Sequence, residues 1–203
     1  MSEVARILSA LWGAWRLANF DRSGFDRFEI TAAGFWHSFL AAAVGAPLFA
    51  LHVLLEREAA EMMVAAAGKT AVFGSFYLAA AMGYVLMWLV FAVLMIPLTR
   101  IAGVAEGYAG LVIAFNWSRV IALVIRLPVM MIAVWGGLGA TAFGAVLLLA
   151  YGLILAYQWF VARVALGSGL VAAAVVLVDL VASAAIARVV TVVLGEPILV
   201  TTQ

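Results

Sequence analysis

Long stretches of the chain carry no charged side chain, and this feature limits the fold more than any other. No Asp, Glu, Lys or Arg lies between Arg126 and Arg163. A bilayer core about 30 Å thick is crossed by about 20 apolar residues in a helix. Of the 203 residues, 68% are hydrophobic and 10% are charged, whereas soluble domains carry about 25% charged residues. The sequence therefore predicts an all-α, polytopic integral membrane protein.

Five apolar runs are long enough to span a bilayer, and charged or glycine-rich breaks separate them. They cover residues 33–55, 71–98, 109–135, 140–164 and 169–193. The turn between the third and fourth runs is expected at 136–139, because it holds three glycines. A break at Pro128 would give six spans, and this alternative stays open. We expect a cytoplasmic helix with its polar connector at 1–32, five transmembrane helices at 33–194, and a short exterior tail at 195–203.

The N-terminal segment 3–20 has a different pattern. Its large apolar side chains recur at helical spacing, namely Val4, Ile7, Leu8, Leu11, Trp12 and Trp15. Arg6 and Arg16 fall on the other face. This predicts a helix parallel to the membrane plane, with Trp12 and Trp15 at headgroup level and the arginines directed outward. Packing on the protein's own cytoplasmic face is the alternative, and both can hold together.

Basic residues near the ends of the runs predict the orientation. Of the 11 basic residues, six fall on the N-terminal side of the predicted spans and three on the opposite side. Arg119 and Arg126 fall within a span. Because short cytoplasmic loops are rich in Lys and Arg, we expect a cytoplasmic N-terminus and an exterior C-terminus.

Charged and amide side chains inside the predicted spans are the main candidate site. The helical rise places Arg119 and Asp179 at the same depth, about 15 Å from the cytoplasmic entry of the third and fifth spans. Charges inside a bilayer face a partner or a water cavity. We therefore expect Arg119 and Asp179 to form an ion pair, joined by Asn116 one turn away. A pore-lining or proton-relay role is the alternative.

Metal and haem sites have little support in the sequence. Cysteine is absent. His37 and His52 are separated by about 22 Å along one predicted helix, so they cannot bind one metal ion or one haem. Three acidic residues are expected in the first exterior loop as a solvated surface, with cation binding as the alternative: Glu56, Glu58 and Glu61.

Catalytic and nucleotide-binding motifs are also missing. Gly68-Lys69-Thr70 ends like a phosphate-binding loop, but Met63 occupies the position of the required first glycine. We find no Ser–His–Asp set and no pair of carboxylates within the spans. The sequence therefore predicts no enzyme, no catalytic residue, no metal and no cofactor. With a net charge of +1, it also predicts no nucleic-acid partner.

Small residues four apart favour close helix contacts. Such pairs occur in four spans, as Ala41/Gly45, Ala79/Gly83, Ala140/Gly144 and Ser183/Ala187. Together with the lipid bilayer, we expect a second copy of the chain or a larger membrane complex as partner. The resulting hypothesis is a non-catalytic membrane scaffold or accessory subunit that acts through helix–helix contacts. A small transporter or channel, working as an oligomer, is the alternative.

Two segments and the overall layout resemble known membrane proteins. Residues 115–119 read Phe-Asn-Trp-Ser-Arg, and residues 159–167 read Trp-Phe-Val-Ala-Arg-Val-Ala-Leu-Gly. Both are similar to stretches of bacterial inner-membrane proteins of this shape. The layout over about residues 30–195 resembles the Yip1-like family of five-span membrane proteins. The resemblance implies an inner-membrane location and a role in membrane organisation and partner recruitment rather than in catalysis.

Overall fold

The computed structural model describes residues 2–66, 68–72, 74–137, 140–194 and 198–201. Within these residues, five helical segments are long and apolar enough to cross a membrane, as the sequence predicts. They cover Ala32–Ala66, Phe76–Ile101, Ala105–Trp135, Thr141–Leu166 and Gly169–Leu194. The six-span alternative is wrong, because α5 (Tyr108–Trp135) continues through Pro128.

Short helices precede the spans. They are α1 (Glu3–Ala18), η1 (Arg22–Arg27) and α2 (Ala32–Ser38). Each begins after a side-chain cap whose oxygen accepts a backbone N–H, provided by Ser2, Asp21 and Thr31. α2 turns at Phe39 into α3 (Leu40–Ala66), and the two together form the first span.

The first span is longer than the sequence predicts. α3 continues past Leu55, so that the span comprises 35 residues, or about 52 Å of helix against a core of about 30 Å. The prediction of an acidic exterior loop is therefore wrong, because the three glutamates lie on the helix. An ion pair between residues one helical turn apart stabilises this extension. It joins Arg57 Nε to Glu61 Oε1 at 2.8 Å.

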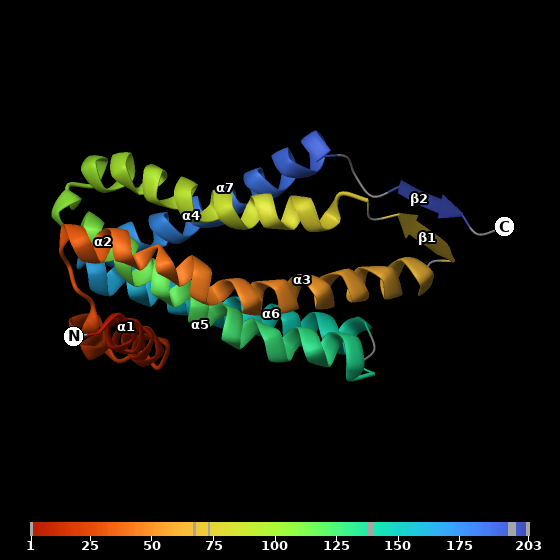
Figure 1. Cartoon of the computed structure of the whole chain (residues 1–203), viewed down its shortest axis with the longest axis horizontal. Coiled ribbons are helices and arrows are strands. Elements are labelled where there is room, and N and C mark those ends of the chain that lie inside the picture. Colours follow the sequence, from red (N-terminus) through yellow and green to blue (C-terminus); the bar gives the residue numbers. More distant parts are fainter. Residues whose placement is uncertain (1, 67, 73, 138–139, 195–197, 202–203) are drawn as a thin grey trace.

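A two-stranded sheet lies at one end of the bundle. β1 (Lys69–Val72) pairs antiparallel with β2 (Ile198–Thr201), with Lys69 opposite Thr201. Gly68 precedes β1 with a φ of 67°, a left-handed conformation that suits glycine after a helix end. The second span consequently starts at Phe76, in α4 (Phe76–Ile101), and not at residue 71 as predicted. Figure 1 shows the sheet at the end opposite α1, as an odd number of spans requires.

The centre of the bundle is α5. Residues 110–121 of this helix are all buried. α5 follows η2 (Ala105–Gly107) and packs against α1, α2, α3, α4 and α6 (Ala140–Leu166). The last helix, α7 (Gly169–Leu194), packs against α4 and α6. In this position α5 carries the polar residues of the third span into the protein interior and away from lipid.

Tyrosine hydroxyls connect the helices inside the bundle. Three of them donate to a main-chain carbonyl of another helix, in the pairs Tyr84–Ala42 at 2.6 Å, Tyr108–Ala92 at 3.0 Å and Tyr157–Ala14 at 2.8 Å. A helix carbonyl has a second lone pair free for such a bond. These bonds satisfy the hydroxyls within a lipid environment, where an unpaired polar group is costly.

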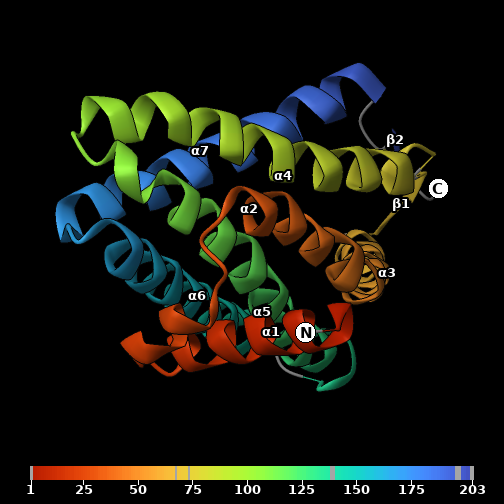
Figure 2. The same ribbon diagram turned by 60° about the vertical axis from the view of Figure 1, so that its left-hand side comes forward.

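α1 lies across one end of the bundle. Figure 1 shows it end-on while the long helices run horizontally, and Figure 2 shows it from the side. The helix approaches the polar connector between α1 and α2 (residues 19–31) where Gly13 faces Gly24, since a Cβ atom on Gly13 would lie 2.6 Å from the Gly24 carbonyl oxygen. Residues 3–18 form a helix, as expected. The contact between Gly13 and Gly24 sets the distance between α1 and η1.

Candidate functional site

The buried charges of the third and fifth spans meet in the structure. Arg119 Nη2 donates to Asp179 Oδ1 at 2.6 Å, which joins α5 to α7. The side chains are 7% and 11% exposed, so the pair is largely shielded. The two residues expected to share one depth thus contact each other directly.

Arg119 has further partners on α4 and on its own helix. Its Nη1 donates to the Met87 carbonyl at 3.1 Å. Three aromatic rings surround the guanidinium, with centroids 4.7 Å away for Phe91 and 5.5 Å away for Trp88 and Phe115. Cation–π contacts of this kind are strongest when desolvated. The charge is therefore held by one carboxylate, one carbonyl and three ring faces, which together link α4, α5 and α7.

Asn116 does not join this pair. Its Nδ2 donates to Ser38 Oγ at 2.9 Å, and Ser38 Oγ donates in turn to the Phe35 carbonyl at 2.7 Å. The predicted three-residue cluster is thus two separate contacts, one between α5 and α7 and the other between α5 and α2. The Asn116 Oδ1 atom is buried and has no hydrogen-bond partner among the described residues.

A cavity of about 180 Å³ opens beside the ion pair. It lies among α3, α4, α5, α6 and α7, and its lining is mostly apolar. Its polar lining residues include Arg119, Asp179, Arg126, Gln158 and Ser183. At about 30 Å³ of liquid volume per water, the space suits several waters or one small solute.

The sequence placed Arg126 within a span but assigned it no partner or role, whereas the structure places it in the lining of this cavity. Its guanidinium lies 5.0 Å from the centre of the Tyr151 ring. Among the described residues it makes no ion pair within 4 Å. Its position two turns along α5 from Arg119 was available in the sequence, but a side chain's neighbours on other helices were not. The cavity thus contains one arginine in a close ion pair and one, Arg126, that rests on a ring face with the Glu56 carboxylate beyond ion-pair distance.

α1 turns its two tryptophans outward. Trp12 is 53% exposed and Trp15 is 44% exposed, whereas Ala14 and Leu17 are fully buried against the protein. Arg16 binds Asp21 on the connector, from Nη2 to Oδ2 at 2.7 Å. Arg16 thus joins α1 to the connector, and its side chain stays 32% exposed. Small residues fill the opposite side of α1, so the helix packs on the protein and exposes an apolar stripe at the same time.

Arg16 and Ser23 also determine the acidity of Asp21. A hydrogen bond from the Ser23 side chain, followed by one from Arg16, holds the pKa of the Asp21 carboxyl below its ordinary value of 3.8. Asp21 is therefore ionised at neutral pH, and it connects the end of α1 to the start of η1.

The remaining predicted residues lie apart from this cavity. His37 is near Glu3, with Nε2 3.8 Å from Oε1, and His52 is near Glu56, with Nε2 3.9 Å from Oε2. Over the described ranges, no group of three or more His, Cys, Asp and Glu side chains is placed to hold a metal ion. Gly68 immediately precedes β1, and Lys69 is the first residue of that strand.

Comparison with protein-family models, with curated proteins and with solved structures gives no match. The resemblance that remains is the layout itself, a helical membrane protein with five spans.

Proposed function

We propose that the protein is a non-catalytic membrane scaffold or accessory subunit, and that it acts through contacts between its helices and those of a second copy. The main support is the unequal use of its small-residue faces. Gly45 on α3 is occupied within the chain, because a Cβ there would lie 3.0 Å from the Tyr84 hydroxyl. A Cβ on Gly83 of α4 or on Gly144 of α6 would meet no atom within 4 Å. These two glycines are open to a partner.

The Arg119–Asp179 pair supports a structural role for the charged cluster. Its partners come from the chain itself and link three helices. A proton relay requires several titratable groups in series, whereas Asp179 is the one carboxylate among the described residues that line this cavity. We propose that the pair fixes how the helices dock. This rigidity would give a partner one defined surface.

The Yip1-like layout agrees with this proposal, since that family is associated with membrane organisation and partner recruitment. We also propose that the α1 end faces the cytoplasm of a bacterial inner membrane. Six basic residues lie on that side of the spans, in line with the enrichment of Lys and Arg in cytoplasmic loops.

Counting subunits in membranes tests the scaffold proposal. Protein labelled at one introduced cysteine would be diluted into large vesicles, and stepwise photobleaching would give the distribution of copies per complex. We expect dimers or higher assemblies, and Gly144→Leu should shift them to monomers by filling the open face of α6. Ala156→Leu is the matched control, because Ala156 is exposed on the same helix about 120° away. Monomers at every protein density would refute self-association.

A small transporter or channel is the second candidate, and the cavity beside Arg126 favours it. The lining combines the Arg126 cation with Gln158 and Ser183, which suits a small anion or a chain of waters. Vesicles containing the purified protein would be tested for chloride and proton flux with internal dyes. Flux that is lost in Arg126→Gln, at unchanged thermal stability, would favour transport over the scaffold. Flux equal to that of empty vesicles would reject it.

A further inference from the structure

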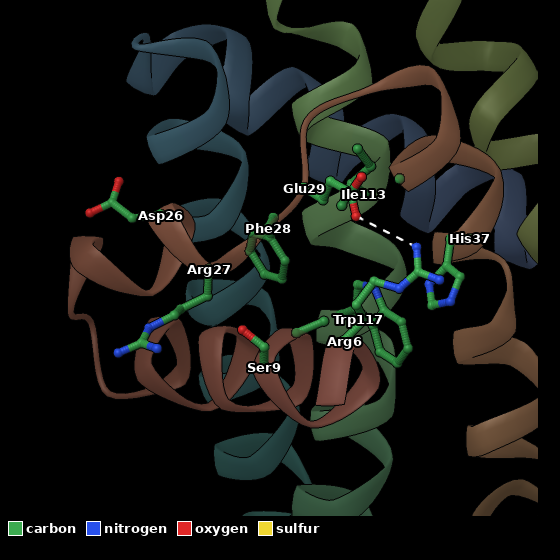
Figure 3. A pocket seen from close by; sticks show the side chains of 11 residues that line it. Arg6, Ser9, Asp26, Arg27, Phe28, Glu29, His37, Ile113 and Trp117 are labelled. Atoms are coloured by element: carbon green, nitrogen blue, oxygen red, sulfur yellow. Dashed lines mark ion pairs between the residues drawn. The ribbon is translucent and has the colours of Figure 1, made fainter. Parts of the chain in front are cut away.

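A second and larger cavity lies at the α1 end of the molecule. Its volume is about 680 Å³, and residues of α1, the connector, α2 and α5 line it. Figure 3 shows Arg6 reaching from α1 toward Glu29 of the connector and His37 of α2, with Trp117 of α5 beside them. Ligand pockets have volumes of about 300–1,000 Å³. The space is therefore large enough for a polar organic group.

Two nitrogen atoms of residues that line this cavity lack hydrogen bonds within the described part of the chain. Arg6 Nε and His37 Nε2 are shielded from solvent and have no partner among the described residues. The nearest carboxylate oxygens are 3.9 Å from Arg6 Nη1, on Glu29, and 3.8 Å from His37 Nε2, on Glu3. Both distances exceed a hydrogen bond. Because buried polar atoms are normally satisfied, a ligand oxygen between Arg6 and His37 would complete the site.

Charges of both signs line the cavity. Arg6 and Arg27 are cations, and Asp26 and Glu29 are anions. A purely anionic ligand would meet repulsion from the two carboxylates, and a purely cationic one would meet it from the arginines. A zwitterion with its phosphate near Arg6 and an ammonium group near Glu29 satisfies both signs.

Exposed tryptophans place this cavity near the level of lipid headgroups. Trp36 on α2 is 72% exposed, and Trp12 and Trp15 on α1 are 53% and 44% exposed. Such aromatic side chains gather at membrane–water interfaces. α1 also turns an apolar stripe outward here, with Val4 65% exposed and Leu8 60% exposed. A ligand in the cavity would therefore have acyl chains of the bilayer within reach.

We propose that this cavity binds the headgroup of a zwitterionic aminophospholipid such as phosphatidylethanolamine. Arg6 and His37 hold the phosphate, and Glu29 accepts hydrogen bonds from the ammonium group. Gly34 allows this arrangement, because any Cβ there would collide with the Glu29 carbonyl and push the connector away from α2. Lipid binding at this point ties α1, the connector and α2 together at the membrane surface.

Binding of short-chain lipids to the full-length protein in detergent tests the proposal. Dioctanoyl phosphatidylethanolamine and dioctanoyl phosphatidylglycerol would be titrated against thermal unfolding and against retained mass in native mass spectrometry. We expect the aminophospholipid to bind about tenfold more tightly than phosphatidylglycerol. This ratio of affinities corresponds to the free energy of one charge-assisted hydrogen bond. Inorganic phosphate and free phosphoethanolamine test for a soluble ligand, and binding of either as tight as that of the lipid would overturn the lipid assignment.

Three variants assign the contacts. Arg6→Gln should weaken the binding of both lipids by about tenfold or more, because both carry the phosphate. Glu29→Gln should abolish the preference for the aminophospholipid while leaving phosphatidylglycerol binding in place. Arg22→Gln is the control, since Arg22 is an exposed arginine of the same connector and does not line the cavity. An unchanged preference in Glu29→Gln, or a preference for phosphatidylglycerol in the parent protein, would refute the proposal even if Arg6→Gln failed to fold.

Discussion

Asp179→Asn removes one charge from a buried ion pair with little change in shape. The 2.6 Å contact and the 7% and 11% exposures of its side chains identify it as a shielded pair. Loss of one partner of such a pair costs about 3–5 kcal/mol. We expect a value near 3 kcal/mol, because Arg119 keeps its bond to the Met87 carbonyl and its contact with the Phe91 ring. For a protein of about 200 residues this lowers the unfolding midpoint by about 6–12 °C.

Thermal unfolding in a mild detergent, followed by intrinsic fluorescence or by a dye-free scattering signal, measures this change. Asp26→Asn is the matched control, since Asp26 is exposed and has no ion pair within the described residues. The control should stay within about 0.5 kcal/mol of the parent protein. A midpoint for Asp179→Asn equal to that of the control would refute the view that this pair holds α5 to α7.

A double substitution separates the charge from the packing. Arg119→Met combined with Asp179→Leu removes both charges, and apolar replacement of a buried pair is often neutral or stabilising. We expect it to recover most of the stability that Asp179→Asn loses. Exchanging the two charges should recover less, because a carboxylate at position 119 would face the negative surfaces of three aromatic rings. A double variant as unstable as the sum of its single changes would contradict this account.

Three further predictions follow from the α1 end and the span count. Gly24→Ala should lower stability by about 1–3 kcal/mol and speed proteolysis of the connector, because the new Cβ would lie 2.9 Å from the Arg16 Cβ. Asp21 has a lowered pKa, so its bonds stabilise the fold above pH 3.8 and are lost as the pH falls through its folded pKa. The variant Asp21→Asn should therefore remove this part of the acid sensitivity of α1 docking, which tryptophan fluorescence measures. Reporter fusions before residue 1 and after Gln203 should read opposite sides of the membrane, and the same side for both would refute five spans.

The depth of the candidate site residues in the membrane was predictable from the sequence, but the neighbouring helix that each side chain faces was not. Arg119 and Asp179 could be paired because each residue adds a constant rise along a helix, so that sequence distance gives depth. Asn116 shares nearly the same depth, yet it faces Ser38 on α2. Its direction depends on how α5 is rotated against its neighbours. That rotation results from packing by all five surrounding helices, which no local pattern contains.

The β1–β2 pairing shows the same limit at the other end. Lys69–Val72 and Ile198–Thr201 are each four residues long and far apart in the chain. Neither is stable as a strand alone, since a strand needs a neighbour to pair with. α3 and α7 end on the same side of the bundle and bring the two segments together (Figure 1). The helix count decides that both segments lie on this side, and the tertiary structure decides that they meet.

The sequence by itself determined the class of protein, the five apolar runs and the helix at 3–18, because bilayer thickness and helical periodicity act on local stretches of chain. The tertiary structure decided which side of α1 is buried. This helix has two surfaces able to pack, one of small residues around Ala14 and one with Trp12 and Trp15. The small side is buried because Gly13 and Gly24 allow two backbones to approach closely. Trp12 and Trp15 remain outside, where lipid can cover them.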